Sequence, residues 1–124
     1  MEFNPTENQT MIAQAVRDLC EREVRPNLMD WDERQYFPKE LFTKHFGPAG
    51  MLGVFVPEEY GGAGLGYHEY VDTIVEVARI CGSIGLSVAA HNSLCTGHIN
   101  YFGNHEQKTK WLTKLATGEW LGAW

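Results

Sequence analysis

The sequence predicts an all-α domain, an orthogonal bundle of about five to six helices with one glycine-rich ordered loop. Apolar residues recur at helical spacing in several separate segments, and two of these segments begin with a capping-box pattern. With 124 residues, 44% of them apolar and 12% aromatic, the chain is long enough for one domain with a buried core.

The first helix is expected to begin at the capping box that Thr6 and Gln9 can form. Helical spacing then continues through the apolar residues Ile12, Ala15, Val16 and Leu19. Pro26 has no N–H group to donate to the preceding turn, so this helix should end or kink near Arg25. A short second helical piece is expected to follow.

The middle of the chain contains a short helix and then a stretch rich in glycine. Pro38 suits a first helical position, and the Gly47-Pro48 pair stops the helix that follows it. Residues 49–66 contain many glycines around an apolar run at residues 51–56. This run is consistent with an ordered loop packed on the core or with a short strand.

A third helix is predicted over residues 67–80, and Gly82 should stop it. Ser83 can then cap a helix that extends from residue 84 to about residue 95. Because residues 84–95 are apolar almost all round, this helix is expected to lie in the centre of the bundle.

The last quarter of the chain continues the helical pattern. Residues 96–102 fit a helix or a turn, and a second capping box, Asn104 with Gln107, should start a helix that Gly118 ends. Residues 119–124 are apolar and aromatic without a polar tail, so we expect the polypeptide to continue beyond Trp124.

Charge and segment composition exclude several classes of protein. The net charge of -6 argues against a nucleic-acid or anionic-lipid surface. No apolar run of about 18 residues and no signal peptide is seen, so a soluble intracellular protein with no membrane contact is expected. The three cysteines are widely spaced and are predicted to be reduced, buried thiols.

His91, Cys95 and His98 would share one helix face at spacings of four and three, as zinc ligands can. No fourth ligand stands at an obvious spacing, and Gly97 interrupts the pattern, so packing or surface roles are favoured and no metal is predicted. A nucleophilic Cys81 or Cys95 with His91 as base is the less favoured interpretation, because an apolar helix raises the pKa of a thiol.

Two other local patterns carry no predicted chemistry. The glycines of residues 61–66 lack the Lys-Ser/Thr of a phosphate loop, and glycines with positive φ in a surface turn explain them better. The adjacent Glu58 and Glu59 are expected to point apart into solvent rather than to act as an acid and base pair. Local chemistry therefore assigns no catalytic residue.

Four strings taken in order resemble one protein family. LGVFVPEEYGGAG at residues 52–64 resembles the signature loop of acyl-CoA dehydrogenases, and EVRP at 23–26, HNSL at 91–94 and FGNHEQK at 102–108 fit the same family. The resemblance covers essentially all of the chain. It implies that residues 1–124 form the amino-terminal α domain, and that the middle β domain and the carboxy-terminal helical domain are absent from this chain.

The resemblance also implies the chemistry of the full-length protein. That protein would be an FAD-dependent acyl-CoA dehydrogenase that desaturates acyl-CoA at the 2,3 position. It would be a homotetramer, with an electron-transferring flavoprotein as electron acceptor. The catalytic base and most flavin contacts would lie outside residues 1–124, so the isolated chain is expected to be inactive and to retain no FAD. The expected location is the bacterial cytoplasm, or the mitochondrial matrix in a eukaryote.

Carried over by position, the resemblance implies two binding roles in this chain. Leu86, Ala90 and Leu94 would face the acyl tail, and their spacing of four residues places them on one stripe. Trp124 would contact the flavin. The alternatives are that the three stripe residues are ordinary core residues and that Trp124 packs inside the subunit.

Two rival hypotheses remain from other classes of protein. One is a stand-alone helical binding or interaction module without catalysis, for which a polar, solvated carboxyl end would be typical. The other is a heme or metal bundle built on His91 and His98, which rests only on their spacing.

Overall fold

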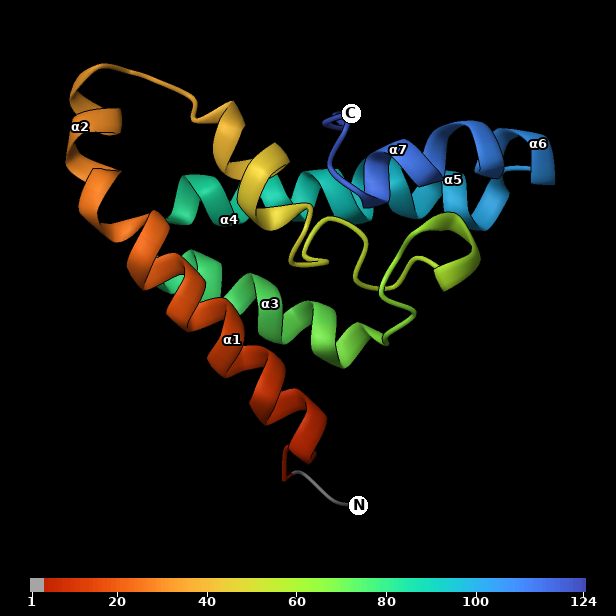
Figure 1. The fold of residues 1–124 in the computed structure, drawn as a ribbon, viewed down its shortest axis with the longest axis horizontal. Helices are drawn as coiled ribbons and strands as arrows, with labels where there is room; N and C mark the ends of the chain where they lie inside the picture. Colours follow the sequence, from red (N-terminus) through yellow and green to blue (C-terminus); the bar gives the residue numbers. More distant parts are fainter. Residues whose placement is uncertain (1–3) are drawn as a thin grey trace.

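The computed structural model describes residues 4–124 and is all-α, with no strand among those residues (Figure 1). The first helix, α1 (Glu7–Glu23), begins at the predicted capping box. The Thr6 hydroxyl accepts from the N–H of Gln9 at 3.2 Å, and the Gln9 side chain accepts from the N–H of Thr6 at 2.8 Å. Val16 and Cys20 of α1 are buried, whereas Ala15 is exposed.

The chain turns at Pro26 as predicted. This proline lies in a 3₁₀ turn, η1 (Arg25–Asn27), and a short helix, α2 (Leu28–Glu33), follows directly. The next helical segment starts after Pro38 and continues through η2 (Leu41–Phe46), whose π-helical turns bury Leu41, Phe42 and Phe46.

Residues 49–66 form an ordered loop and not a strand. Every residue from 51 to 56 is buried, and a single 3₁₀ turn, η3 (Glu58–Tyr60), follows. The loop folds on itself through bonds from the N–H groups of Gly64 and Leu65 to the carbonyls of Val56 and Val54, each at 2.9 Å. A side chain at Gly62 would place its Cβ 2.1 Å from the Val56 carbonyl oxygen, so the close backbone approach requires glycine there.

The third helix, α3 (Tyr67–Ile80), has the predicted bounds and lies beside α1 (Figure 1). Arg17 of α1 joins the two helices by donating to both carboxylate oxygens of Glu76, at 2.8 and 2.9 Å. The Glu76 side chain is 7% exposed and that of Arg17 is 37% exposed, so the pair is shielded on the α3 side. The pair fixes α1 against α3 through charge as well as through packing.

The next helix begins earlier than predicted. Gly82 is the first residue of α4 (Gly82–Ala89) and does not terminate α3, because Cys81 is the extended residue between them, at φ -147° and ψ 112°. Ser83 lies inside α4, so its predicted capping role is wrong. Helix α4 continues through the π-helical turns of η4 (Ala90–Thr96) into α5 (Gly97–Phe102), and the three form one rod.

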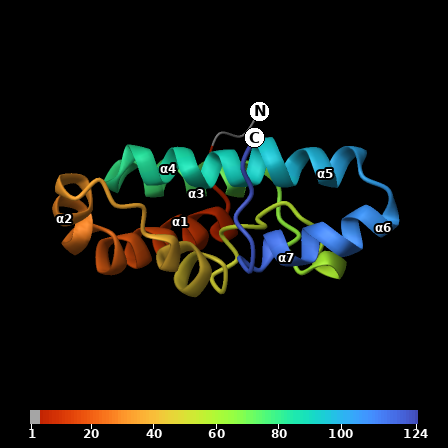
Figure 2. The ribbon, with the colours of Figure 1, turned by 90° about the horizontal axis from the view of Figure 1, so that it is seen from above.

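The last helical segment consists of α6 (His105–Gln107), η5 (Lys108–Leu112) and α7 (Thr113–Ala116). It begins at the predicted capping box of Asn104 and Gln107 and ends before Gly118, whose φ is +80°. Figures 1 and 2 show this segment running back alongside the rod. No helix in the described part of the chain is both long enough and apolar enough to span a membrane.

Candidate functional site

The rod formed by α4, η4 and α5 presents an apolar stripe to solvent. Leu86 is 70% exposed, Leu94 is 43% exposed, and Ala90 between them is half-buried. The predicted central position of residues 84–95 is therefore wrong for this face, while the opposite face, with Ile84 and Val88, is buried. An apolar helix surface on one side of a domain is typical of a surface that another group covers.

The stripe crosses the point where the rod changes its helical geometry. Within η4 the N–H of Gly97 donates to the carbonyl of Asn92, five residues earlier, and the Thr96 hydroxyl donates to the carbonyl of His91 at 2.7 Å. Such widened turns occur frequently at functional sites. Ala90 and Leu94 both lie in this widened segment.

His91 is buried and connects three separate segments. Its Nε2 lies 3.0 Å from the carbonyl oxygen of Leu52 and 3.1 Å from that of Leu115. Its Nδ1 accepts from the N–H of Gly122 at 2.9 Å. Since carbonyls only accept, the Nε2 carries the hydrogen and the ring is neutral. Burial lowers the pKa of His91, and the two carbonyls oppose this effect.

Asn92 extends the same contact to the glycine-rich loop. Its Nδ2 donates to the carbonyl of Met51 at 2.9 Å and to that of Val88 at 3.1 Å. His91 and Asn92 thus join the rod to the start of the loop, at Leu52 and Met51, through buried side chains. The sequence signal for this contact is a pair of polar residues within an otherwise apolar helix, because buried polar groups need partners.

His91 and His98, which share zinc-ligand spacing with Cys95, use their ring nitrogens in other contacts. Both His91 nitrogens are engaged, and the His98 Nδ1 bonds to the carbonyl of Leu94. Among residues 4–124, no cluster of three His, Cys, Asp or Glu side chains could hold a metal ion. Burial raises the pKa of the Cys95 thiol and raises that of Cys20 to about 12, so neither environment favours a reactive thiolate.

The glycine-rich turn and the paired carboxylates show no site geometry. Gly61 and Gly64 have positive φ, as a surface turn requires. Glu58 and Glu59 are both exposed in η3. These residues have the structural roles that the sequence analysis favoured.

Trp124 lies on the surface beside the stripe-bearing rod. It is 85% exposed, and its ring stacks on that of His98 with centroids 4.8 Å apart and planes at 17°. Within residues 4–124 no other element covers the remainder of the Trp124 side chain, so its environment in a longer subunit stays a prediction. One face of the indole is covered by His98, and an exposed aromatic face can receive another planar ring.

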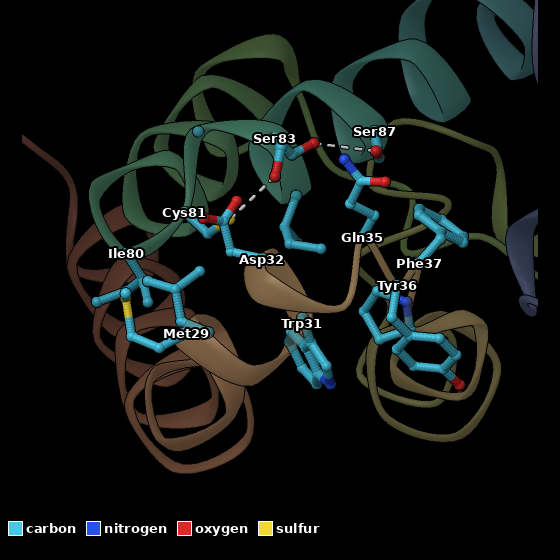
Figure 3. A pocket seen from close by; sticks show the side chains of 14 residues that line it. Met29, Trp31, Asp32, Gln35, Tyr36, Phe37, Ile80, Cys81, Ser83 and Ser87 are labelled. Atoms are coloured by element: carbon cyan, nitrogen blue, oxygen red, sulfur yellow. Dashed lines mark hydrogen bonds between the residues drawn. The ribbon is translucent and has the colours of Figure 1, made fainter.

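A cavity of about 780 Å³ opens at the amino-terminal end of α4 (Figure 3). Trp31 of α2 and Phe37 form one side of it, and Ser83 and Ser87 form another. The Ser87 hydroxyl donates to the carbonyl of Ser83 at 2.9 Å. None of the three stripe residues lines the cavity, so it is separate from the candidate surface.

Fold and surface together define an α-helical domain that exposes an apolar stripe and an aromatic ring along one rod. Residues 6–119 match the family model of the acyl-CoA dehydrogenase N-terminal domain. The chain belongs to the acyl-CoA dehydrogenase family, and it corresponds to the amino-terminal portion of that family's members.

Individual relatives agree with this assignment. The chain is 42% identical over 124 residues to the short-chain specific acyl-CoA dehydrogenase of Clostridium acetobutylicum, matching all of this chain and 32% of that protein. The chain thus spans about a third of the length of that relative.

Solved structures of the same family share the fold. Butyryl-CoA dehydrogenase from Megasphaera elsdenii is 30% identical, with a TM-score of 0.91 over 98% of this chain and 32% of its own. An acyl-CoA dehydrogenase from Bacillus anthracis, solved in complex with FAD, is 35% identical, with a TM-score of 0.87 over 95% of this chain and 20% of its own.

Proposed function

We propose that residues 1–124 are the amino-terminal α domain of a longer FAD-dependent acyl-CoA dehydrogenase, and that Leu86, Ala90 and Leu94 form one wall of its acyl pocket. The observation that carries this proposal is the exposed apolar stripe on the α4 rod. Family membership and the names of the similar proteins support the substrate class.

The stripe has the length and the chemistry that an acyl tail requires. Eight residues separate Leu86 from Leu94, which corresponds to about 12 Å along a helix. Covering the two leucines with a hydrocarbon chain removes apolar surface from water. Ala90 carries only a methyl group, so it leaves depth between the leucines. A bulkier residue there would shorten the pocket.

Trp124 is the residue that would contact the flavin. Its exposed ring face fits one edge of a planar aromatic cofactor and does not enclose it, so most flavin contacts would come from other domains. A bound flavin would supply the acceptor for the hydride that leaves the β-carbon of the thioester. This chain would orient the acyl tail and exclude water from it. It supplies no residue that we assign as the catalytic base.

The remaining features of the proposal concern the full-length protein. Its partners would be the acyl-CoA substrate and an electron-transferring flavoprotein, and its assembly would be a homotetramer. Bacterial cytoplasm or the mitochondrial matrix would be the location, since the chain is acidic overall and its relatives include a bacterial protein and a human protein described as mitochondrial.

Leu86→Gln separates a pocket role from a core role. In the 124-residue chain we expect the free energy of unfolding to change by less than about 0.5 kcal/mol, because the side chain is already exposed. In the full-length protein we expect kcat/KM for acyl-CoA to fall about tenfold, because an amide would enter an apolar pocket. Urea denaturation and steady-state kinetics measure the two effects.

Met11→Gln is the matched control, since Met11 is an exposed apolar residue on α1, away from the stripe. It should leave both quantities unchanged. An unchanged kcat/KM in Leu86→Gln would contradict the pocket role, and a large loss of stability in the isolated chain would assign Leu86 to the core.

The mass of the native polypeptide tests the enzyme assignment as a whole. An antibody to this domain, combined with mass spectrometry, should detect a protein about three times heavier than 14.0 kDa, since the chain covers 32% of its relative. That protein should carry flavin absorbance, whereas the 124-residue chain alone should carry none and oxidise no acyl-CoA. A native product of 14.0 kDa would favour the stand-alone helical binding module instead.

A further inference from the structure

Residues 122–124 lie along the rod in contact with three residues of one face. The N–H of Gly122 donates to His91 Nδ1 at 2.9 Å, and the backbone of Ala123 lies beside the Cys95 thiol, where it lowers the pKa of that thiol against the larger raising effect of burial. The Trp124 ring stacks on His98. Figure 2 shows the carboxyl-terminal segment crossing the rod here. We call His91, Cys95 and His98 the docking stripe.

Gly122 fits against the docking stripe only because it has no side chain. A Cβ at this position would lie 2.6 Å from the Cys95 Sγ and 2.7 Å from its Cβ, closer than real contacts allow. The backbone can therefore approach the rod closely enough for its N–H to reach His91. Any larger residue would lift residues 122–124 from the rod.

The two histidines of the docking stripe are themselves held in place. The carbonyls of Leu52 and Leu115 orient the buried His91 ring, and the carbonyl of Leu94 bonds to the His98 Nδ1. Because the accepting nitrogen of His91 and the stacking ring of His98 are already held in place, these side chains lose little conformational entropy when residues 122–124 dock. The docking stripe is thus a preorganised binding surface for residues 122–124 and not a set of chance contacts.

We propose that His91, Cys95 and His98 are positioning residues, which seat residues 122–124 and thereby set the place of the Trp124 ring. The significance of that ring for the flavin rests on the proposed function. The seating itself depends only on the contacts above. The same three residues that share the spacing of metal ligands thus bind a segment of their own chain.

Gly122→Ala tests the seating in the 124-residue chain by NMR spectroscopy. The wild type should show nuclear Overhauser contacts between the Trp124 indole and the His98 ring, and an upfield ring-current shift of the His98 protons. We expect both to be lost in Gly122→Ala.

Gly82→Ala is the matched control, because nothing lies within 4 Å of a Cβ at Gly82. It should retain the contacts between Trp124 and His98. Contacts that persist in Gly122→Ala, or that are missing from the wild type, would overturn the proposal. The wild-type measurement decides even if the variant does not fold.

A flavin measurement separates this proposal from the proposed function. In the full-length protein, Gly122→Ala should shift the flavin absorbance spectrum if Trp124 contacts the cofactor. If the NMR contacts behave as expected but the flavin spectrum is unchanged, the docking stripe stands and the flavin contact of Trp124 fails.

Discussion

His91→Ala is expected to lower the free energy of unfolding of the 124-residue chain by about 3–5 kcal/mol. The substitution leaves the carbonyls of Leu52 and Leu115 and the N–H of Gly122 without their side-chain partner, and it opens a cavity in the core. Each unsatisfied buried group costs about 1–3 kcal/mol. Urea denaturation monitored by circular dichroism measures the loss.

His98→Ala is the control, because His98 is an exposed histidine about two helical turns further along the same rod. It should cost less than about 1 kcal/mol, since the groups that lose a contact, the Leu94 carbonyl and the stacked Trp124 ring, meet His98 at an exposed position. A His91→Ala variant as stable as His98→Ala would contradict the role of His91 as a buried connector of three segments.

Glu76→Gln is expected to destabilise the chain by about 2 kcal/mol at neutral pH. The amide keeps the shape of the side chain but cannot accept both charge-assisted bonds from Arg17. The cost stays below that of a fully buried pair, because the Arg17 side chain is 37% exposed and recovers some hydration.

The effect of Glu76→Gln should depend on pH in a defined direction. The hydrogen bonds and charge of Arg17 lower the pKa of Glu76 below its ordinary value of 4.5. The unfolded chain then binds a proton before the folded chain does as the pH falls. The carboxylate's contribution is therefore complete above pH 4.5 and is lost as the pH falls through the lowered pKa. The wild type and the variant should converge in stability at acid pH.

Asp30→Asn is the matched control for charge loss at the surface. Asp30 pairs with Arg34 at 2.9 Å, four residues along α2, and both side chains are at least 60% exposed. Exposed pairs contribute less than about 0.5 kcal/mol, so this variant should unfold almost like the wild type. Equal losses in Glu76→Gln and Asp30→Asn would show that burial of Glu76 does not matter.

Local sequence signals predicted most helix boundaries, because capping and turn residues act within a few positions. Thr6, Asn104, Pro26 and Gly118 all mark the ends they were expected to mark. The capping role predicted for Ser83 is wrong because an extended Cys81 lets the helix begin two residues earlier, which depends on how α3 and α4 pack and not on local preference.

The placement of the rod could not be predicted from composition. Residues 84–95 are apolar all round, and periodicity alone does not say whether both faces are covered within the same chain. The structure buries Ile84 and exposes Leu86, so the stripe that the family resemblance assigns to the acyl pocket is an outer surface of this domain. Contacts such as His91 with Leu52 join residues far apart in sequence, and no short motif encodes them.

The glycine-rich loop has a consequence for the order in which the chain folds. No sheet holds residues 51–56 within the described chain, and the carbonyls of Met51 and Leu52 bond to side chains about forty positions later, at Asn92 and His91. Closing so long a segment costs entropy before any of these bonds form. We therefore expect the loop to reach its native arrangement only after the rod has formed, although it precedes the rod in the chain; hydrogen-exchange labelling during refolding that protected residues 51–56 before residues 84–96 would contradict this order.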